Sequence, residues 1–258
     1  MQIDLNCDMG EGFGVYTIGG EEQVMPFITS ANIACGFHAS DPETIWKTIK
    51  MAKANGVSVG AHPSYPDLVG FGRRPMEVSA EEVIADVIYQ VGALSAFCKR
   101  EGVKLQHVKP HGALYNKAAV DSSIALAIAE AIKSVDADLY MVCLSNSEMV
   151  AAARTAGIRY VEEFFADRAY TREGKLVPRT QMGAVIHDPA AAAERVLTMV
   201  RDRFVAAIDG TSVPINAQTI CVHGDTAEAI EMIRVIKTRL EQENVQLKAF
   251  GGFAAKAE

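Results

Sequence analysis

Long apolar runs are absent from this sequence of 258 residues. No stretch reaches the roughly 18 consecutive apolar residues that a membrane-spanning helix needs. The first residues, MQIDLN, also lack the basic segment and apolar core of a secretory signal peptide. We therefore expect a protein that is neither exported nor inserted in a membrane.

Positive charge and paired cysteines are scarce as well. The formal net charge is −7 at pH 7, and no block of lysine and arginine alternates with aromatic residues. This balance argues against a nucleic-acid or anionic-membrane partner. The five cysteines include no CxxC pair, and a chain of this length does not need disulfides for stability. The pattern fits a reduced, cytoplasmic environment, with cysteine used as a small buried hydrophobic residue.

Standard motifs for nucleotide and zinc binding are also missing. The sequence has no GxxxxGK[ST] loop, no GxGxxG that opens a helix after a strand, and no HExxH. If a nucleotide or a metal binds, it must therefore bind to residues outside these standard motifs.

What the sequence does contain is a regular alternation of short apolar runs with segments of helical period. This alternation predicts βαβ units and a parallel sheet. Asp41 and Asp188 each precede a proline at a first helical position, and Ser79 with Glu82 reads as a capping box. Strands are expected near residues 2–7, 31–35, 57–61, 105–109, 138–143, 158–165 and 219–222, and helices near 43–55, 80–101, 121–134, 146–156, 189–208 and 226–243.

The number of expected strands indicates a closed barrel. Seven strands, with an eighth at Gln246 to Phe250, predict a single β/α barrel over residues 1–258, because such barrels close at about 250 residues. A doubly wound open sheet is the alternative. The long irregular connection near 168–186 is expected to form a small hairpin, and its length is typical of a functional lid or a surface excursion.

Polar clusters directly follow the expected strands. In a parallel barrel the carboxyl ends of all strands meet on one rim, where barrel enzymes build their active sites. The clusters are NCDMGEGFG from Asn6, ACGFHASDP from Ala34, GAHPSYPD from Gly60, HVKPHGALYN from His107, FADRAY from Phe165 and CVHGDT from Cys221.

The side chains in these clusters are of types that transfer protons, bind anions or ligate metals. Each taken alone has a structural explanation, but their convergence predicts one functional pocket. A divalent metal is one interpretation, with ligands drawn from Asp8, His38 and His62. The candidates are Asp8, His38, His62, Lys109, His111, Asp167 and His223.

The segment GFGRRP, residues 70–75, adds two permanent cations. Arg73 and Arg74 carry forked donors that suit a carboxylate or a phosphate. For either arginine alone, a surface salt bridge explains the residue equally well.

Six colinear strings make the sequence resemble the LamB/YcsF family from Asp4 to about Phe250. Ser40 departs from the family pattern, which has glycine before the aspartate. The resemblance implies a variant TIM-like barrel allied to the glycoside hydrolase/deacetylase superfamily. It also implies the A component of a bacterial ATP-dependent 5-oxoprolinase, with subunits B and C as partners and ATP as co-substrate. The strings are DLNCDMGEGFG, ANIACGFHASDP, GAHPSYPD with GFGRR, VKPHGALYN, EFFADRAY followed by LVPR, and CVHGDT.

On this resemblance, the rim would open the lactam of 5-oxoproline to give L-glutamate. Asp8 or His62 would act as general base. Lys109 and His111 would hold a phosphate or a developing oxyanion, and Asp167 would orient one of them. The substrate would be bound by Asn6, Glu11, His38, Asp41, Arg73, Asn116, Arg168, Arg179 and His223.

Two other functions compete with this one. A stand-alone metal-dependent amidase or deacetylase would use the same rim without ATP. A non-catalytic subunit would bind the lactam and present it to its partners.

Overall fold

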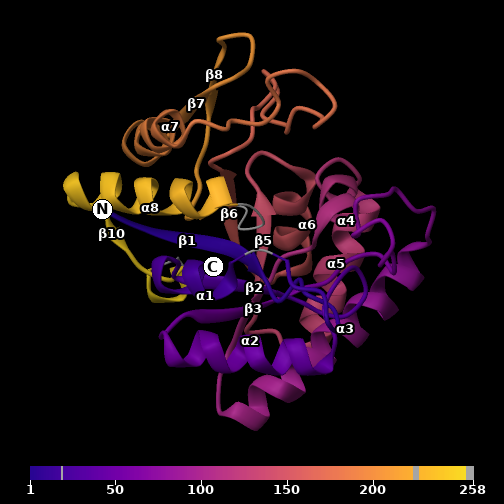
Figure 1. Ribbon diagram of the computed structural model, residues 1–258. Helices are drawn as coiled ribbons and strands as arrows, with labels where there is room; N and C mark the ends of the chain where they lie inside the picture. Colours follow the sequence, from indigo (N-terminus) through magenta and orange to yellow (C-terminus); the bar gives the residue numbers. More distant parts are fainter. Residues whose placement is uncertain (19, 223–226, 254–258) are drawn as a thin grey trace.

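Seven parallel strands close into a barrel in the computed structural model, which describes residues 1–18, 20–222 and 227–253 (Figure 1). The ring closes because Asp4 to Asn6 of the first strand pair with Thr219 to Cys221 of the last. The predicted TIM-like barrel is confirmed, and the open sheet is wrong. In ring order the strands are β1 (Gln2–Met9), β2 (Ser30–Ala34), β3 (Ser58–His62), β4 (Leu105–Val108), β5 (Tyr140–Leu144), β6 (Arg159–Phe165) and β9 (Thr219–Cys221).

Helices surround the strands on the outside of the barrel (Figure 1). Asp41 and Asp188 accept hydrogen bonds from backbone amides of the helices they precede, and Ser79 with Glu82 forms the predicted capping box. Among the described residues, no helix is both long and apolar enough to cross a membrane. The helices are α1 (Glu21–Val24), α2 (Pro42–Ala54), α3 (Ala80–Glu101), α4 (Gly112–Ala118), α5 (Ser122–Val135), α6 (Glu148–Ala156), α7 (Pro189–Asp202) and α8 (Ala227–Gln242), with short 3-10 helices η1 (Met25–Phe27) and η2 (Phe250–Gly252).

Two predicted elements differ from the structure. The helix expected to reach residue 208 ends at Asp202, because Arg203 has a φ of +59° in the left-handed region. The chain then forms an antiparallel pair, β7 (Phe204–Ala206) and β8 (Ser212–Pro214). The eighth strand is only two residues long, β10 (Gln246–Leu247), and it pairs with the start of β1 outside the ring.

The interior of the barrel is polar. Side chains alternate along a strand, so Asp4, Asn6 and Asp8 of β1 share one face. This face points inward: Ser30 donates to Asp4 at 2.7 Å, and Asn32 donates to Asp8 at 2.9 Å. The branched aliphatic residues usual in such an interior are replaced by hydrogen-bonded groups. The chemistry of the rim therefore continues down into the barrel.

Asp4 makes the stability of this interior depend on pH. Burial raises the pKa of its carboxyl from 3.8 to about 6, although hydrogen bonds from Thr219, Thr29 and Ser30 oppose the shift. The folded protein holds this proton more tightly than the unfolded chain does. The contribution of this carboxyl to the free energy of unfolding is therefore fully present below pH 3.8 and is lost as the pH rises to about 6.

Asparagine is a neutral substitute for the protonated carboxyl, so Asp4→Asn should remove this dependence. Relative to the unchanged protein, the variant should gain up to about 3 kcal/mol of unfolding free energy between about pH 4 and pH 7. Urea unfolding of both proteins at the two pH values measures the difference. If the difference between the two proteins stayed constant with pH, Asp4 would not be the group that titrates.

Candidate functional site

A cavity of about 690 Å³ opens at the carboxyl ends of the barrel strands. Asp8 near the end of β1, His62 at the end of β3 and Lys109 just after β4 contribute to its lining. Residues far apart in the chain meet here because every parallel strand ends on the same rim. The location agrees with the predicted pocket.

The Lys109 ammonium lies in the mouth of the barrel and is 2% exposed. Its Nζ lies 3.0 Å from Asp8 Oδ1 and 3.1 Å from Glu163 Oε1. It also donates to Asn6 Oδ1 at 3.3 Å and to Cys221 Sγ at 3.0 Å. Burial alone would lower the pKa of Lys109, but the nearby negative charges outweigh it and hold that pKa well above its ordinary value. The lysine therefore stays charged and links β1, β6 and β9.

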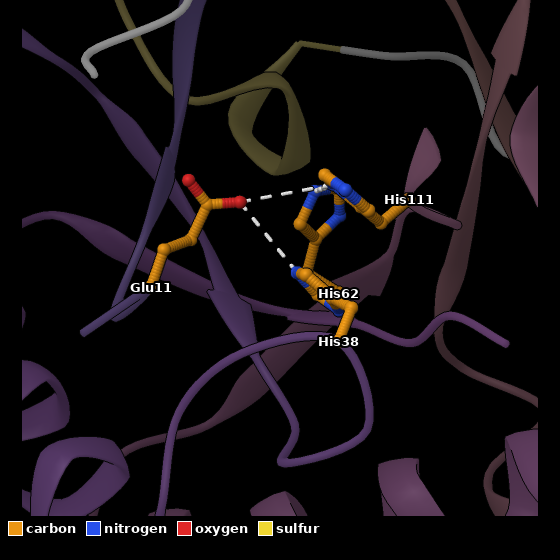
Figure 2. A group of neighbouring side chains, drawn as sticks. All are labelled: Glu11, His38, His62 and His111. Atoms are coloured by element: carbon orange, nitrogen blue, oxygen red, sulfur yellow. Dashed lines mark hydrogen bonds and ion pairs between the residues drawn. The ribbon is translucent and has the colours of Figure 1, made fainter. Parts of the chain in front are cut away.

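Three histidines and a glutamate gather at this rim (Figure 2). His111 Nδ1 lies 3.0 Å from His62 Nε2 and 3.7 Å from Glu11 Oε1, and His38 Nε2 lies 3.5 Å from the same oxygen. One ligand atom from each of the four side chains lies within 4.8 Å of the others, and all four residues are buried. This group, the Glu11 cluster, could bind a metal ion.

Two histidines of the Glu11 cluster, His38 and His111, are held as neutral rings. Burial lowers the pKa of His38 and of His111 well below the ordinary value, and the neighbouring imidazoles lower it further. The two rings stack with their centroids 3.9 Å apart. Asp8 Oδ2 lies 3.2 Å from His62 Nε2, so the cluster and the Lys109 network meet at this carboxylate.

Two glycines make room for the histidine rings. Gly72 has a φ of +63°, and a Cβ on it would lie 2.8 Å from both His111 Cδ2 and His38 Cβ. A Cβ on Gly60 would overlap the ring of His107, whose Nε2 lies 2.8 Å from Asn32 inside the barrel. A side chain at either position would displace an imidazole.

The connection between β6 and α7 contributes cations to the cavity. Tyr170 and Leu176 pair in an antiparallel bridge, as expected of a hairpin. Arg168 and Arg179 both line the cavity, and Arg168 also donates to the carbonyl of Val177 at 2.6 Å. Arg168 therefore holds this connection in place as well as facing the cavity.

The two arginines of the GFGRRP segment have different environments. Arg73 lines the cavity. Arg74 donates from Nε to Asp67 Oδ1 at 2.9 Å, and its own side chain is largely exposed. The surface salt bridge therefore explains Arg74, whereas Arg73 places its charge at the cavity.

The structure brings most of the predicted site residues together. Asn6 lies beneath Lys109, Glu11 and His38 belong to the Glu11 cluster, and Asp167 is buried next to Arg168 at 7% exposure. Asp41 caps α2 and accepts from Gly14, which gives it a structural task. His223 lies outside the described residues. The predicted site residues that line the cavity are Asp8, His62, Arg73, Lys109, His111, Asn116, Arg168 and Arg179.

Sequence reasoning missed Glu163, which is fully buried in β6. It accepts from Asn6 at 3.0 Å and from the hydroxyl of Tyr115 at 2.8 Å, and it pairs with Lys109. The indication was present, because Glu162 and Glu163 stand between the apolar residues of a predicted strand. A buried strand rarely contains an acid without a partner.

Known proteins resemble this chain over nearly its whole length. Residues 3–255 match the LamB/YcsF family. A protein of Clostridium beijerinckii, named as the A component of 5-oxoprolinase, is 53% identical over 95% of this chain and 96% of its own. A Campylobacter jejuni protein of the same name is 50% identical over 98% and 99% of the two chains.

A solved structure agrees with both matches. The lactam utilization protein of Thermus thermophilus superposes with a TM-score of 0.93 at 50% identity, over 97% of this chain and 100% of its own. Fold, family match and relatives lead to one assignment: the chain is a member of the LamB/YcsF family.

Proposed function

We propose that this chain is the lactam-opening component of an ATP-dependent 5-oxoprolinase. The whole enzyme would hydrolyse 5-oxoproline to L-glutamate and couple this to hydrolysis of ATP to ADP and phosphate, in the cytoplasm. The relatives named as the A component of 5-oxoprolinase support the substrate, and their naming as one of several subunits supports partners, which we take to be subunits B and C. The observation that carries the proposal is the buried Asp8–Lys109 pair at a cavity surrounded by cations.

The chemistry explains why ATP is needed. The lactam is an unstrained, resonance-stabilised amide, so its carbonyl carbon resists attack by water. Transfer of the γ-phosphoryl group of ATP to the lactam oxygen by the partner subunits would release ADP and activate that carbon. One water would then add to the carbon and the ring C–N bond would break, with a proton passing to nitrogen. A second water would release phosphate and leave glutamate.

The cavity suits the phosphorylated lactam, which carries two anionic groups. Arg73, Arg168 and Arg179 line it and would bind the carboxylate and the phosphate. Both candidate bases line the cavity, but Asp8 is the better placed, because Lys109 and Asn32 hold one of its oxygens and leave the other facing His62.

Lys109 would then stabilise negative charge that develops on the phosphate or carbonyl oxygen. His111 is less suited to this task, because the Nε2 of its neutral ring lies 2.9 Å from the carbonyl oxygen of Phe71, which takes the one hydrogen. Asn116 also lines the cavity and would bind the lactam amide. Asn6 contacts Lys109 from beneath, so its part is to orient the lysine.

The test measures glutamate formed from 5-oxoproline and ATP in a lysate that lacks this protein. Glutamate should appear only when the purified chain is added back, and the chain alone should form none. If the supplemented lysate stays inactive, the lactam is not the substrate. If the chain alone opens the lactam without ATP, the partners are not required.

That second outcome would favour a metal-dependent amidase that acts alone. The observation on its side is the Glu11 cluster, whose four side chains could hold a divalent metal. ATP dependence separates the two functions, because an amidase of this kind would need the metal and no nucleotide.

A further inference from the structure

Two backbone carbonyls fix the protons of His62 and His111. His62 Nδ1 lies 2.6 Å from the carbonyl oxygen of Lys109, and His111 Nε2 lies 2.9 Å from that of Phe71. A carbonyl oxygen only accepts, so each of these nitrogens carries the hydrogen. The opposite nitrogens, His62 Nε2 and His111 Nδ1, therefore present lone pairs.

These lone pairs point at one another. The two nitrogens are 3.0 Å apart, and Asp8 Oδ2 lies 3.2 Å from that of His62. Glu11 Oε1 approaches His111 Nδ1 to 3.7 Å. With both rings neutral, the two facing nitrogens therefore have no hydrogen between them, an arrangement that a cation beside them would stabilise.

This cation could be a proton or a metal ion, and the environment of His38 favours the metal ion. Its ring is fully buried, and neither ring nitrogen has a hydrogen-bond partner among the described residues. Its Nε2 faces Glu11 Oε1 at 3.5 Å (Figure 2). A single proton shared by His62 and His111 would leave His38 with both nitrogens unsatisfied, which is costly for a buried polar group. A metal ion would engage all three rings together.

The spacing also fits. Two ligands that each lie about 2.0–2.1 Å from a tetrahedral ion are about 3.4 Å apart. Three of the measured separations within the Glu11 cluster, 3.0, 3.5 and 3.7 Å, surround this value, and the others, which reach no more than 4.8 Å, would shorten when the ion binds. The outward N–H groups on backbone carbonyls are the usual second shell of a metal-binding histidine.

We propose that Glu11, His38, His62 and His111 bind one divalent transition-metal ion. Three imidazole nitrogens and one carboxylate oxygen suit zinc, cobalt or iron, whereas magnesium and calcium prefer oxygen ligands alone. The site belongs to the isolated chain and does not depend on the lactam being the substrate. The ion would supply Lewis-acid chemistry at the edge of the cavity.

One consequence concerns the roles of Asp8 and His62. With His62 committed to the ion, Asp8 is left as the general base. Asp8 itself is predicted to stay out of the ligand set, because Lys109 and Asn32 already engage one of its oxygens and the other has to accept the proton from water.

The experiment is metal analysis of the purified full chain. After chelator treatment and reloading, the chain should hold about one Zn²⁺ or Co²⁺ per molecule, with the visible absorption of a tetrahedral site for Co²⁺. An excess of Mg²⁺ should not displace it. Thermal unfolding should shift to higher temperature on loading. A chain that retains neither ion would overturn the proposal.

Variants locate the ion. His38→Gln should weaken Zn²⁺ binding by more than about tenfold. His187→Gln is the control, because His187 is the exposed histidine outside the rim clusters. Equal loss in the two variants, or none in His38→Gln, would place the metal elsewhere and overturn the assignment.

A second pair covers the event that His38→Gln fails to fold. Gly72→Ala should weaken binding because its Cβ would displace His38 and His111. Gly56→Ala, at φ +68° with no atom within 4 Å, carries the same backbone strain without the displacement. If Gly72→Ala bound zinc as tightly as Gly56→Ala, the rings at Gly72 would not be ligands.

Discussion

Asp8→Asn should lower kcat for lactam opening by about 10²–10⁴-fold in the complex reconstituted with its partners. The amide keeps the shape of the carboxylate and can still accept from Lys109 and Asn32. It cannot take a proton from water. Glutamate release from 5-oxoproline and ATP measures the change, and the melting temperature shows whether the fold is intact.

Asp136→Asn is the matched control for Asp8. Asp136 follows α5 at the other end of the barrel, where its side chain accepts from the backbone amide of Asp138 at 2.8 Å. This variant should keep full activity. An Asp8→Asn complex that also opened the lactam at the original rate would remove Asp8 from the chemistry.

Lys109→Met should cost about 3–5 kcal/mol of unfolding free energy, since it leaves the buried carboxylates of Asp8 and Glu163 without their shared cation. For a chain of this size, such a loss lowers the melting temperature by on the order of 10 °C. Methionine keeps most of the side-chain volume, so the effect reports charge more than packing. Differential scanning calorimetry of the purified chain provides the measurement.

A second substitution tests whether the loss of stability in Lys109→Met comes from the unpaired charges or from altered packing. Adding Glu163→Gln to Lys109→Met removes one of the stranded charges and should recover part of the melting temperature, but not the activity. Lys47→Met is the control, because Lys47 pairs with Glu43 at 2.8 Å on an exposed face of α2. That pair is screened by water, so its loss should leave the melting temperature unchanged. A similar fall in both lysine variants would contradict the argument.

The residues of the rim could be predicted from the sequence because the pattern that marks them lies within short segments. Each polar cluster follows an apolar run, and parallel strands bring their ends together. The side chains inside the barrel could not be predicted in the same way. Whether Glu162 or Glu163 points inward depends on the phase of the strand, and an apolar run does not fix that phase. The partner Lys109 lies more than 50 residues away, so no short pattern links the two.

The Glu11 cluster shows a related limit. His38 and His62 were predicted to be potential ligands, but with Asp8 in place of Glu11 and His111. The choice between the two sets depends on distances of about an ångström across three loops, which spacing in the sequence does not encode. The end of α7 was missed for another reason, because the apolar residues beyond Asp202 continue the helical period into β7.

The pairing of β1 with β9 has a consequence for synthesis on the ribosome. Thr219 donates a hydrogen bond to Asp4 across 215 residues of sequence. One edge of β1 therefore stays unpaired until nearly the whole chain has emerged. At about 5–20 residues per second this takes roughly 10–40 s. An unpaired strand edge can cause aggregation during that time, and inward-pointing charges are a known protection. We therefore expect the charges of Asp4 and Asp8 to reduce aggregation through this edge during synthesis, before the two side chains take their places inside the barrel.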